Sequence, residues 1–152
     1  MTTKKKELIV TSALPYANGP LHFGHLLEHI QTDIWVRSQR ILGNHCIYLC
    51  ASDAHGTPVM MKAEEENISP EKLVDKYMKA HKKTLESFQV SHDCYYQTHS
   101  EENKKYSELI FNTAQKNGFI SKKNIKQLYD EEKKLFLADR YVQGNCPKCN
   151  AP

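Results

Sequence analysis

Hydrophobic and polar residues follow one another along the first hundred residues in blocks that predict strands and helices in turn. An apolar run at 8–13, LIVTSA, is typical of a short buried strand, and CIYLCA at 46–51 is typical of a second. Between about 22 and 42, apolar residues recur mostly every three or four positions, which predicts a helix with one buried face. These apolar positions are Phe23, Leu26, Leu27, Ile30, Ile34 and Ile41. Strand, helix and strand in this order predict a βαβ unit, so the two strands should be parallel.

Start signals mark further helices after the second strand. At Thr57-Pro58 we expect Thr57 to cap a helix that has proline at its first position, and Ser69-Pro70 repeats this pattern. Ser100, followed by two glutamates, predicts another helix that ends at Gly118. YYQTH at 95–99 has the composition of a weak third strand.

Composition changes near residue 119, and this change predicts a domain boundary. Residues 1–118 carry the alternating strands and helices of an α/β domain with a parallel sheet. Residues 119–152 are polar, with short aromatic or aliphatic patches, and contain CPKC at 146–149. Two thiolates two residues apart can form one edge of a tetrahedral zinc site, although a turn with free thiols or a redox pair has the same pattern.

Length, charge and cysteine count exclude several classes of protein. The 152 residues suffice for one ordinary domain, and the formal net charge of +3 only mildly favours a polyanionic partner. The sequence shows neither a secretory signal nor an apolar run long enough to span a membrane, so we expect a cytoplasmic protein without a membrane partner. The five cysteines are then reduced thiols or metal ligands. We expect Cys46, Cys50 and Cys94, next to or within predicted strands, to be buried thiols.

Two unusual polar segments follow the first two predicted strands. LPYANGPLHFGH (14–25) follows the first strand, and SDAHGTP (52–58) follows the second. Parallel strands end at the same edge of a sheet, and ligands of open α/β sheets bind outside that edge. The two segments should therefore meet at one site.

The residue types in these segments suit a phosphate ligand and an ammonium group. His22 and His25 are three residues apart at a predicted helix start, where free N–H groups and the helix dipole favour phosphate. Imidazoles there can donate hydrogen bonds to phosphate oxygens in a transition state. Gly24 would let a flat ligand approach the backbone, and Asp53 can bind an ammonium group. A metal hydrolase with His22, His25, Asp53 and His55 as ligands is an alternative.

Several segments resemble one known family. HFGH (22–25) resembles the HIGH signature of class I aminoacyl-tRNA synthetases, which follows the first strand of their Rossmann-like catalytic domain. ALPYANGPLHFGHLLEHIQTDIWVR and ASDAHGTP are similar to the methionyl-tRNA synthetases, and THSEEN, FLADRYVQG and CPKC match that family in the same order. The resemblance implies that 1–118 is the first half of a Rossmann-like catalytic domain. It implies that 119–152 begins a connective insertion with a zinc knuckle, so that the chain is an N-terminal fragment.

The resemblance also implies a function, a methionine–tRNA ligase. Such an enzyme activates L-methionine with ATP and Mg²⁺ to methionyl-adenylate and transfers the methionyl group to tRNA(Met). This chain alone is expected to be inactive, and a homodimer is one assembly that the resemblance allows for the full protein. The alternative is a non-enzymatic half-synthetase that binds tRNA or zinc.

Specific residues take roles through the same resemblance. The implied catalytic residues are His22 and His25. The implied ATP-binding residues are Pro15, Asn18, Gly19, His22, Gly24 and His25. The implied methionine-binding residues are Ala13, Leu14, Tyr16 and Asp53. The implied Zn²⁺ ligands are Cys146 and Cys149, with two further ligands beyond residue 152. Phe23 replaces an aliphatic residue of the HIGH pattern, and we expect its side chain to be packed inside the protein.

Overall fold

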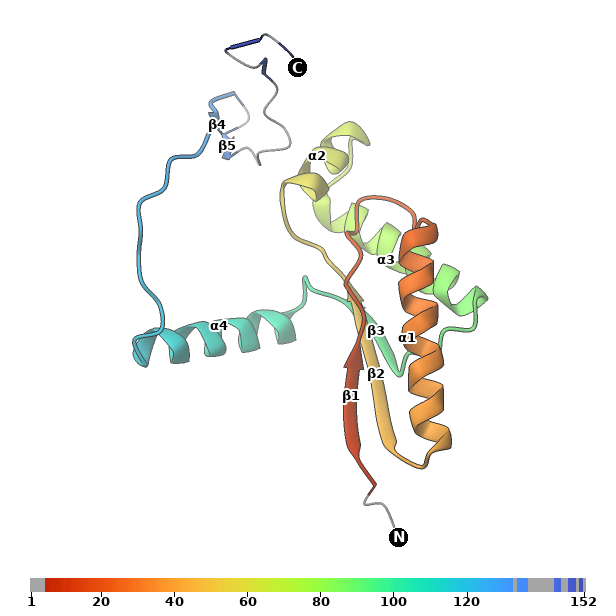
Figure 1. Ribbon diagram of the computed structural model, residues 1–152. Coiled ribbons are helices and arrows are strands. Elements are labelled where there is room, and N and C mark those ends of the chain that lie inside the picture. The colour runs from red at the N-terminus through yellow and green to blue at the C-terminus, as the bar shows by residue number, and fades with distance from the viewer. Residues whose placement is uncertain (1–4, 133, 137–143, 146–147, 150, 152) are drawn as a thin grey trace. The chain divides into compact units, whose positions relative to one another are not determined.

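The helices and strands alternate from the N-terminus, as the hydrophobic pattern predicts (Figure 1). The computed structural model describes residues 5–132, 134–136, 144–145, 148–149 and 151. The elements are β1 (Glu7–Thr11), α1 (Phe23–Ile41), β2 (His45–Ser52), α2 (Thr57–Glu65), α3 (Pro70–Ser87), β3 (Cys94–Gln97), α4 (Glu101–Lys116), β4 (Tyr129–Asp130) and β5 (Leu135–Phe136). The chain divides into two compact units, Met1–Tyr106 and Ser107–Pro152, and α4 runs across the division. None of the helices in the described residues has the length and apolar character needed to cross a membrane.

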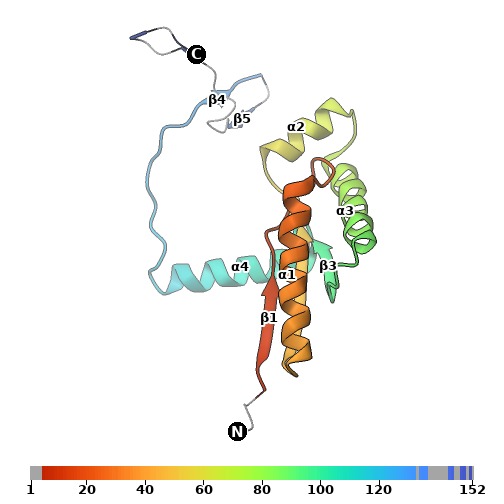
Figure 2. The ribbon, with the colours of Figure 1, turned by 45° about the vertical axis from the view of Figure 1, so that its right-hand side comes forward.

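The first unit contains a three-stranded parallel sheet in the order β1-β2-β3. Leu8 pairs with Cys46 and Val10 pairs with Tyr48, so the covered faces of β1 and β2 are in register. Helices α1 and α3 pack on this face, as Figure 1 and the turned view in Figure 2 show. The core between them contains the buried side chains Val36, Cys46, Tyr48, Cys50, Leu85, Val90 and Tyr95. The predicted α/β class and the parallel βαβ unit are confirmed.

The other face of the sheet is exposed within the first unit. Ile9 on β1 is 78% exposed, and Leu49 and Tyr96 on the next two strands are also exposed. Cys94 pairs with Leu49 and lies on this face, so our expectation that Cys94 is buried was wrong. Side chains alternate between the faces of a strand, and the neighbouring Tyr95 occupies the covered face.

The face that helix α1 turns to the sheet coincides only in part with its apolar residues, of which Leu26 and Ile30 pack against the core. Its buried residues are His29, Asp33 and Val36, whereas Ile34 and Ile41 are exposed. Polar groups can be buried when they are hydrogen-bonded, and Asp33 accepts bonds from the backbone and hydroxyl of Ser91. The predicted helix is therefore confirmed, but its predicted buried face is only partly right.

The helix starts follow the predicted signals with one change. Ser69 caps α3 by accepting a hydrogen bond from the Lys72 N–H, and Ser100 accepts one from the Asn103 N–H. The N-cap of α2 is Gly56 rather than Thr57, and Thr57 is already helical. Gly56 has a φ of 111°, a conformation that glycine adopts without steric cost. The backbone thus ends β2 and enters α2 through a turn that only glycine fits easily.

The second unit contains a short antiparallel pair that the sequence analysis did not predict. Tyr129 on β4 pairs with Phe136 on β5, and their ring centroids are 4.9 Å apart. The composition change near residue 119 lies within this unit. The assignment of residues 119–152 to a separate domain remains a prediction.

Candidate functional site at the carboxyl edge of the sheet

The two polar segments meet at the carboxyl edge of the sheet, as their positions after β1 and β2 predict. Tyr16 and Asp53 form an isolated parallel bridge beyond the strands. The Asp53 N–H donates to the Pro15 carbonyl at 2.8 Å, and the Ala17 N–H donates to the Asp53 carbonyl at 2.8 Å. Residues almost forty positions apart in the sequence are thus fixed side by side, near the start of α1 (Figure 1).

His22 and His25 cap the N-terminus of α1 with their own side chains. His22 Nδ1 accepts hydrogen bonds from the backbone N–H groups of Gly24 (3.1 Å) and His25 (3.4 Å). His25 Nδ1 in turn accepts from the His22 N–H at 3.3 Å, which completes a capping box made of two imidazoles. The rings are stacked with centroids 3.7 Å apart.

This capping determines which ring nitrogens remain for a ligand. Because each Nδ1 accepts a backbone N–H, a neutral ring carries its proton on Nε2. Burial lowers the pKa of His25, and repulsion from the charged forms of His22 and His81 lowers it further. His25 therefore offers a neutral Nε2–H donor near neutral pH, beside the positive end of the helix dipole.

Gly24 fits closely against the histidine cap. A Cβ at position 24 would lie 3.0 Å from His22 Cε1 and 3.1 Å from His22 Nδ1. A larger residue would therefore require the capping ring of His22 to shift by a few tenths of an ångström. This packing gives Gly24 a role in addition to the expected close approach of a ligand.

The segment before the cap exposes alternate side chains. Ala13, Leu14 and Tyr16 are exposed, while Pro15 and Ala17 are buried. Glu28 on α1 accepts a hydrogen bond from the Ala13 N–H at 2.5 Å and so fixes the start of this segment. The three side chains expected to contact methionine are thus accessible, whereas Pro15 offers little surface to a nucleotide.

Asp53 lies partly buried between the two segments. Its Oδ1 atom accepts hydrogen bonds from the His55 N–H at 3.2 Å and from Thr98 Oγ1 at 3.5 Å. Among the described residues it forms no ion pair with a lysine, arginine or histidine. Its carboxylate is thus oriented by neutral donors and can bind a ligand cation.

His81 supports this site from α3, and the sequence analysis missed it. Its Nε2 donates to the Gly19 carbonyl at 2.7 Å, and its Nδ1 contacts Ser52 Oγ at 2.9 Å. Burial lowers the pKa of His81, consistent with a neutral ring in this role. The apolar periodicity of 70–87 places residue 81 on the buried face with Val74 and Leu85. A histidine on that apolar face could have indicated a buried residue with specific hydrogen-bond partners.

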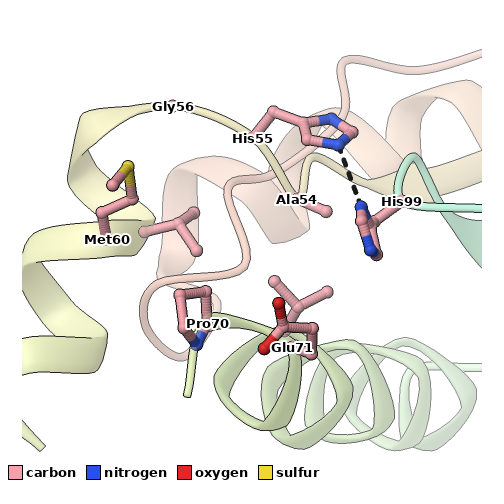
Figure 3. A pocket seen from close by; sticks show the side chains of 9 residues that line it. Ala54, His55, Gly56, Met60, Pro70, Glu71 and His99 are labelled. Carbon is pink, nitrogen blue, oxygen red and sulfur yellow. Dashed lines mark hydrogen bonds between the residues drawn. The ribbon is translucent and has the colours of Figure 1, made fainter. Parts of the chain in front are cut away.

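A mainly apolar pocket of about 250 Å³ lies beside the segment that follows Asp53, at Ala54 and His55 (Figure 3). Its lining residues are Ala54, His55, Gly56, Val59, Met60, Pro70, Glu71, Val74 and His99. His55 Nε2 and His99 Nδ1 are 3.3 Å apart at one side of the pocket. The histidine pair at 22 and 25 does not line this pocket.

Two sets of metal ligands were predicted from the sequence, a hydrolase set at 22, 25, 53 and 55 and a zinc pair at 146 and 149. Within the described part of the chain, the one cluster of three or more potential metal ligands is His29, Cys50 and His92, so the hydrolase set at 22, 25, 53 and 55 is not assembled. Cys149 is exposed, and Cys146 lies outside the described residues. The zinc knuckle therefore stays a prediction.

Comparisons with known proteins identify a family from the sequence and a fold from solved structures. A sequence model of the family described as tRNA synthetases class I (M) matches residues 8–152. The agnB2 LeuRS of Agrobacterium radiobacter K84, solved as a ternary complex with tRNA and LeuAMS, has a TM-score of 0.77 and 20% identity, over 99% of this chain and 19% of that chain. Methionyl-tRNA synthetase of Mycobacterium tuberculosis, in complex with methionyl-adenylate, has a TM-score of 0.79 and 21% identity, over 98% of this chain and 30% of that chain. The chain thus has the α/β, Rossmann-like fold of these structures and spans less than a third of either.

Proposed function

This chain belongs to the family of class I tRNA synthetases (M), and from that premise we propose that it is the N-terminal part of a methionine–tRNA ligase. The complete enzyme would activate L-methionine with Mg-ATP and transfer the methionyl group to tRNA(Met). The observation that carries the proposal is the junction at the sheet edge. There the Tyr16–Asp53 bridge joins the segment before the histidine cap to the end of β2.

In this proposal the histidine cap binds the phosphates of ATP. The Nε2–H groups of His22 and His25 would donate to phosphate oxygens as the methionine carboxylate attacks the α-phosphorus and pyrophosphate leaves. Because the Nδ1 atoms already bond to the backbone, the donors are positioned before the substrate arrives, which is how such groups lower a barrier. Asn18, Gly19 and Gly24 would lie along the nucleotide.

Methionine would bind on the exposed segment before the cap. The Asp53 carboxylate would bind the ammonium group, and Ala13 and Leu14 would contact the apolar side chain. Tyr16 is 45% exposed, and its ring can contact a thioether sulfur favourably. The methionine specificity rests on the residues that resemble methionyl-tRNA synthetases, since one of the two similar structures is a LeuRS.

The first test is amino-acid-dependent exchange of pyrophosphate into ATP by the intact protein. Methionine should support exchange and leucine should not. Exchange with leucine in preference to methionine would reject the proposed specificity, and no exchange with any amino acid would favour the non-enzymatic tRNA-binding alternative.

A matched pair of histidine variants tests the role of the cap. His25→Ala should slow adenylate formation by about 10²–10³, the usual effect of removing one positioned donor, with little change in methionine binding. His45→Ala is the control, because His45 is an exposed histidine at the opposite end of β2. Equal rates for the two variants in a pre-steady-state assay would contradict the assignment.

A further inference from the structure

Three ligand-type side chains converge behind the sheet edge, in the covered core of the first unit. His29 comes from α1, Cys50 from β2, and His92 from the loop before β3. Their nearest ligand atoms all lie within 4.8 Å of one another. His29 and Cys50 are almost fully buried, and His92 is partly buried. The proposed ligase chemistry uses none of these three residues.

The spacing of the two imidazoles fits one metal ion. His29 Nδ1 and His92 Nε2 are 3.4 Å apart. A tetrahedral Zn²⁺ ion with Zn–N distances of 2.0–2.1 Å places two nitrogen ligands about 3.3 Å apart. A Zn–S distance of 2.3 Å places the sulfur about 3.6 Å from each nitrogen, so closing the cluster requires movement of at most about 1 Å.

The ligand atoms are chemically available. Burial lowers the pKa of His29, and burial together with His29 lowers the pKa of His92 to about 4, so both rings are neutral at neutral pH. His29 Nδ1 lies beside Ser12 Oγ and His92 Nε2, and coordination through Nδ1 would place the ring proton on Nε2, which is buried and has no hydrogen-bond partner among the described residues. Burial raises the pKa of the Cys50 thiol, and a bound metal ion would displace that proton.

The cluster also has a polar neighbour and a route of entry. Ser12 Oγ lies 3.1 Å from His29 Nδ1 and 3.4 Å from Cys50 Sγ, where a hydroxyl can complete the coordination or bond to a metal-bound water. A pocket of about 320 Å³ reaches His92 and is bordered by Lys82, Glu86 and Asp93. An ion can therefore approach the partly buried member of the cluster from this pocket.

We propose that His29, Cys50 and His92 form a binding site for a divalent transition-metal ion of the zinc class. Two imidazoles and one thiolate are a donor set that suits Zn²⁺ and Co²⁺ and does not suit Mg²⁺ or Ca²⁺. The site uses neither the cysteines at 146 and 149 nor the residues proposed to bind the substrates. Its existence does not depend on the proposed ligase activity.

Titration of the metal-free intact protein with Co²⁺ tests the site directly. All measurements use a background with Cys146→Ser and Cys149→Ser, which removes the other thiolate pair. We expect one Co²⁺ per chain, with the visible bands of tetrahedral cobalt and a near-ultraviolet thiolate-to-cobalt charge-transfer band. Surface histidines that bind cobalt do not produce the charge-transfer band.

Variants of the ligands and of nearby cysteines then identify the site. Cys50→Ser should abolish the charge-transfer band, and His92→Gln should weaken Co²⁺ binding by more than about 100-fold, beyond the effect of losing an outer-shell partner. Cys46→Ser and Cys94→Ser should keep the band, since Cys46 is a buried cysteine on the same strand and Cys94 lines the same pocket as His92.

Three results would overturn the proposal. They are no charge-transfer band in the background protein, a band that survives Cys50→Ser or a Co²⁺ affinity unchanged by His92→Gln, and a band lost in Cys94→Ser. In the first case the cluster is a hydrogen-bonded network only. Circular dichroism of each variant tests whether it is folded. His92→Gln keeps the test valid if Cys50→Ser does not fold, because His92 is only partly buried.

Discussion

Two serine–histidine–tyrosine clusters in the first unit have the same construction and different surroundings. The first cluster consists of Ser12, His29 and Tyr48, and the second consists of Ser52, His81 and Tyr95. In each cluster, a serine at the carboxyl end of one strand contacts a tyrosine on the next strand and a histidine on a helix between those two strands in the sequence. The helix is α1 in the first cluster and α3 in the second. The serine–histidine distances are 3.1 and 2.9 Å, and the serine–tyrosine distances are 3.0 and 2.9 Å. All six side chains are buried.

The two clusters differ in the hydrogen bonding of the histidine Nε2 atom. His81 Nε2 donates to the Gly19 carbonyl and so ties α3 to the segment before the histidine cap. His29 Nε2 has no partner among the described residues, and its Nδ1 is near both Ser12 and His92. In the second cluster, the three side chains therefore form a structural anchor. In the first cluster, ring nitrogens remain available as ligand atoms, and Cys50 and His92 lie next to them.

The largest expected effect is a difference in stability between variants of the two histidines. His81→Leu should lower the free energy of unfolding by about 3 kcal/mol, because the Gly19 carbonyl and the Ser52 hydroxyl both lose a buried partner. His29→Leu should cost about 1 kcal/mol, because it also removes a nitrogen that is already unpaired. Urea denaturation of the metal-free protein measures both. Equal losses would mean that the two clusters are energetically equivalent.

Acid should lower the stability of the protein in a defined range of pH through His92, which lies beside the first cluster. The pKa of His92 is lowered from 6.5 to about 4 in the folded protein, so the unfolded chain binds the proton more tightly. Stability should therefore fall as the pH decreases from 6.5 toward 4, by about 2 kcal/mol once the partial exposure of the ring is considered.

The variant His92→Gln checks the source of this pH dependence. The lowered pKa values of His29 and His81 contribute in the same direction, so the variant should lose a part of the slope and keep the rest. Unfolding free energies at about pH 7 and about pH 5, for both proteins, give the comparison. A slope unchanged by the substitution would assign the effect to other groups.

The two serines should each have a smaller effect than His81→Leu. Ser52→Ala and Ser12→Ala should each cost about 1–2 kcal/mol, because each hydroxyl bridges a histidine and a tyrosine. Ser52→Ala should be at the upper end, since its two contacts are shorter and His81 has a further bond to maintain. Ser107→Ala is the exposed control and should stay within about 0.5 kcal/mol of the parent. A serine variant as mild as this control would show that its cluster contributes no net stability.

Local signals in the sequence predicted the elements well and the side-chain environments less well. Periodicity and cap residues located the strands and helices of the first unit, and the parallel connection placed the two polar segments at one edge. The same periodicity assigned Phe23 to packing, and this was wrong, because Phe23 is 78% exposed at the start of α1. Hydrophobicity alone also placed Cys94 inside, although the alternation along β3 turns it outward.

The sequence alone indicates that the segments carrying the histidines, the glycine and the aspartate meet where two parallel strands end. That conclusion follows from local pattern and chain connection, which need no knowledge of distant contacts. The three-dimensional arrangement was needed to show which histidines are buried, which nitrogen each one uses, and that Cys50 lies beside His29 and His92. Those relations join residues far apart in the chain, such as His81 and Gly19, and local periodicity carries no information about such partners.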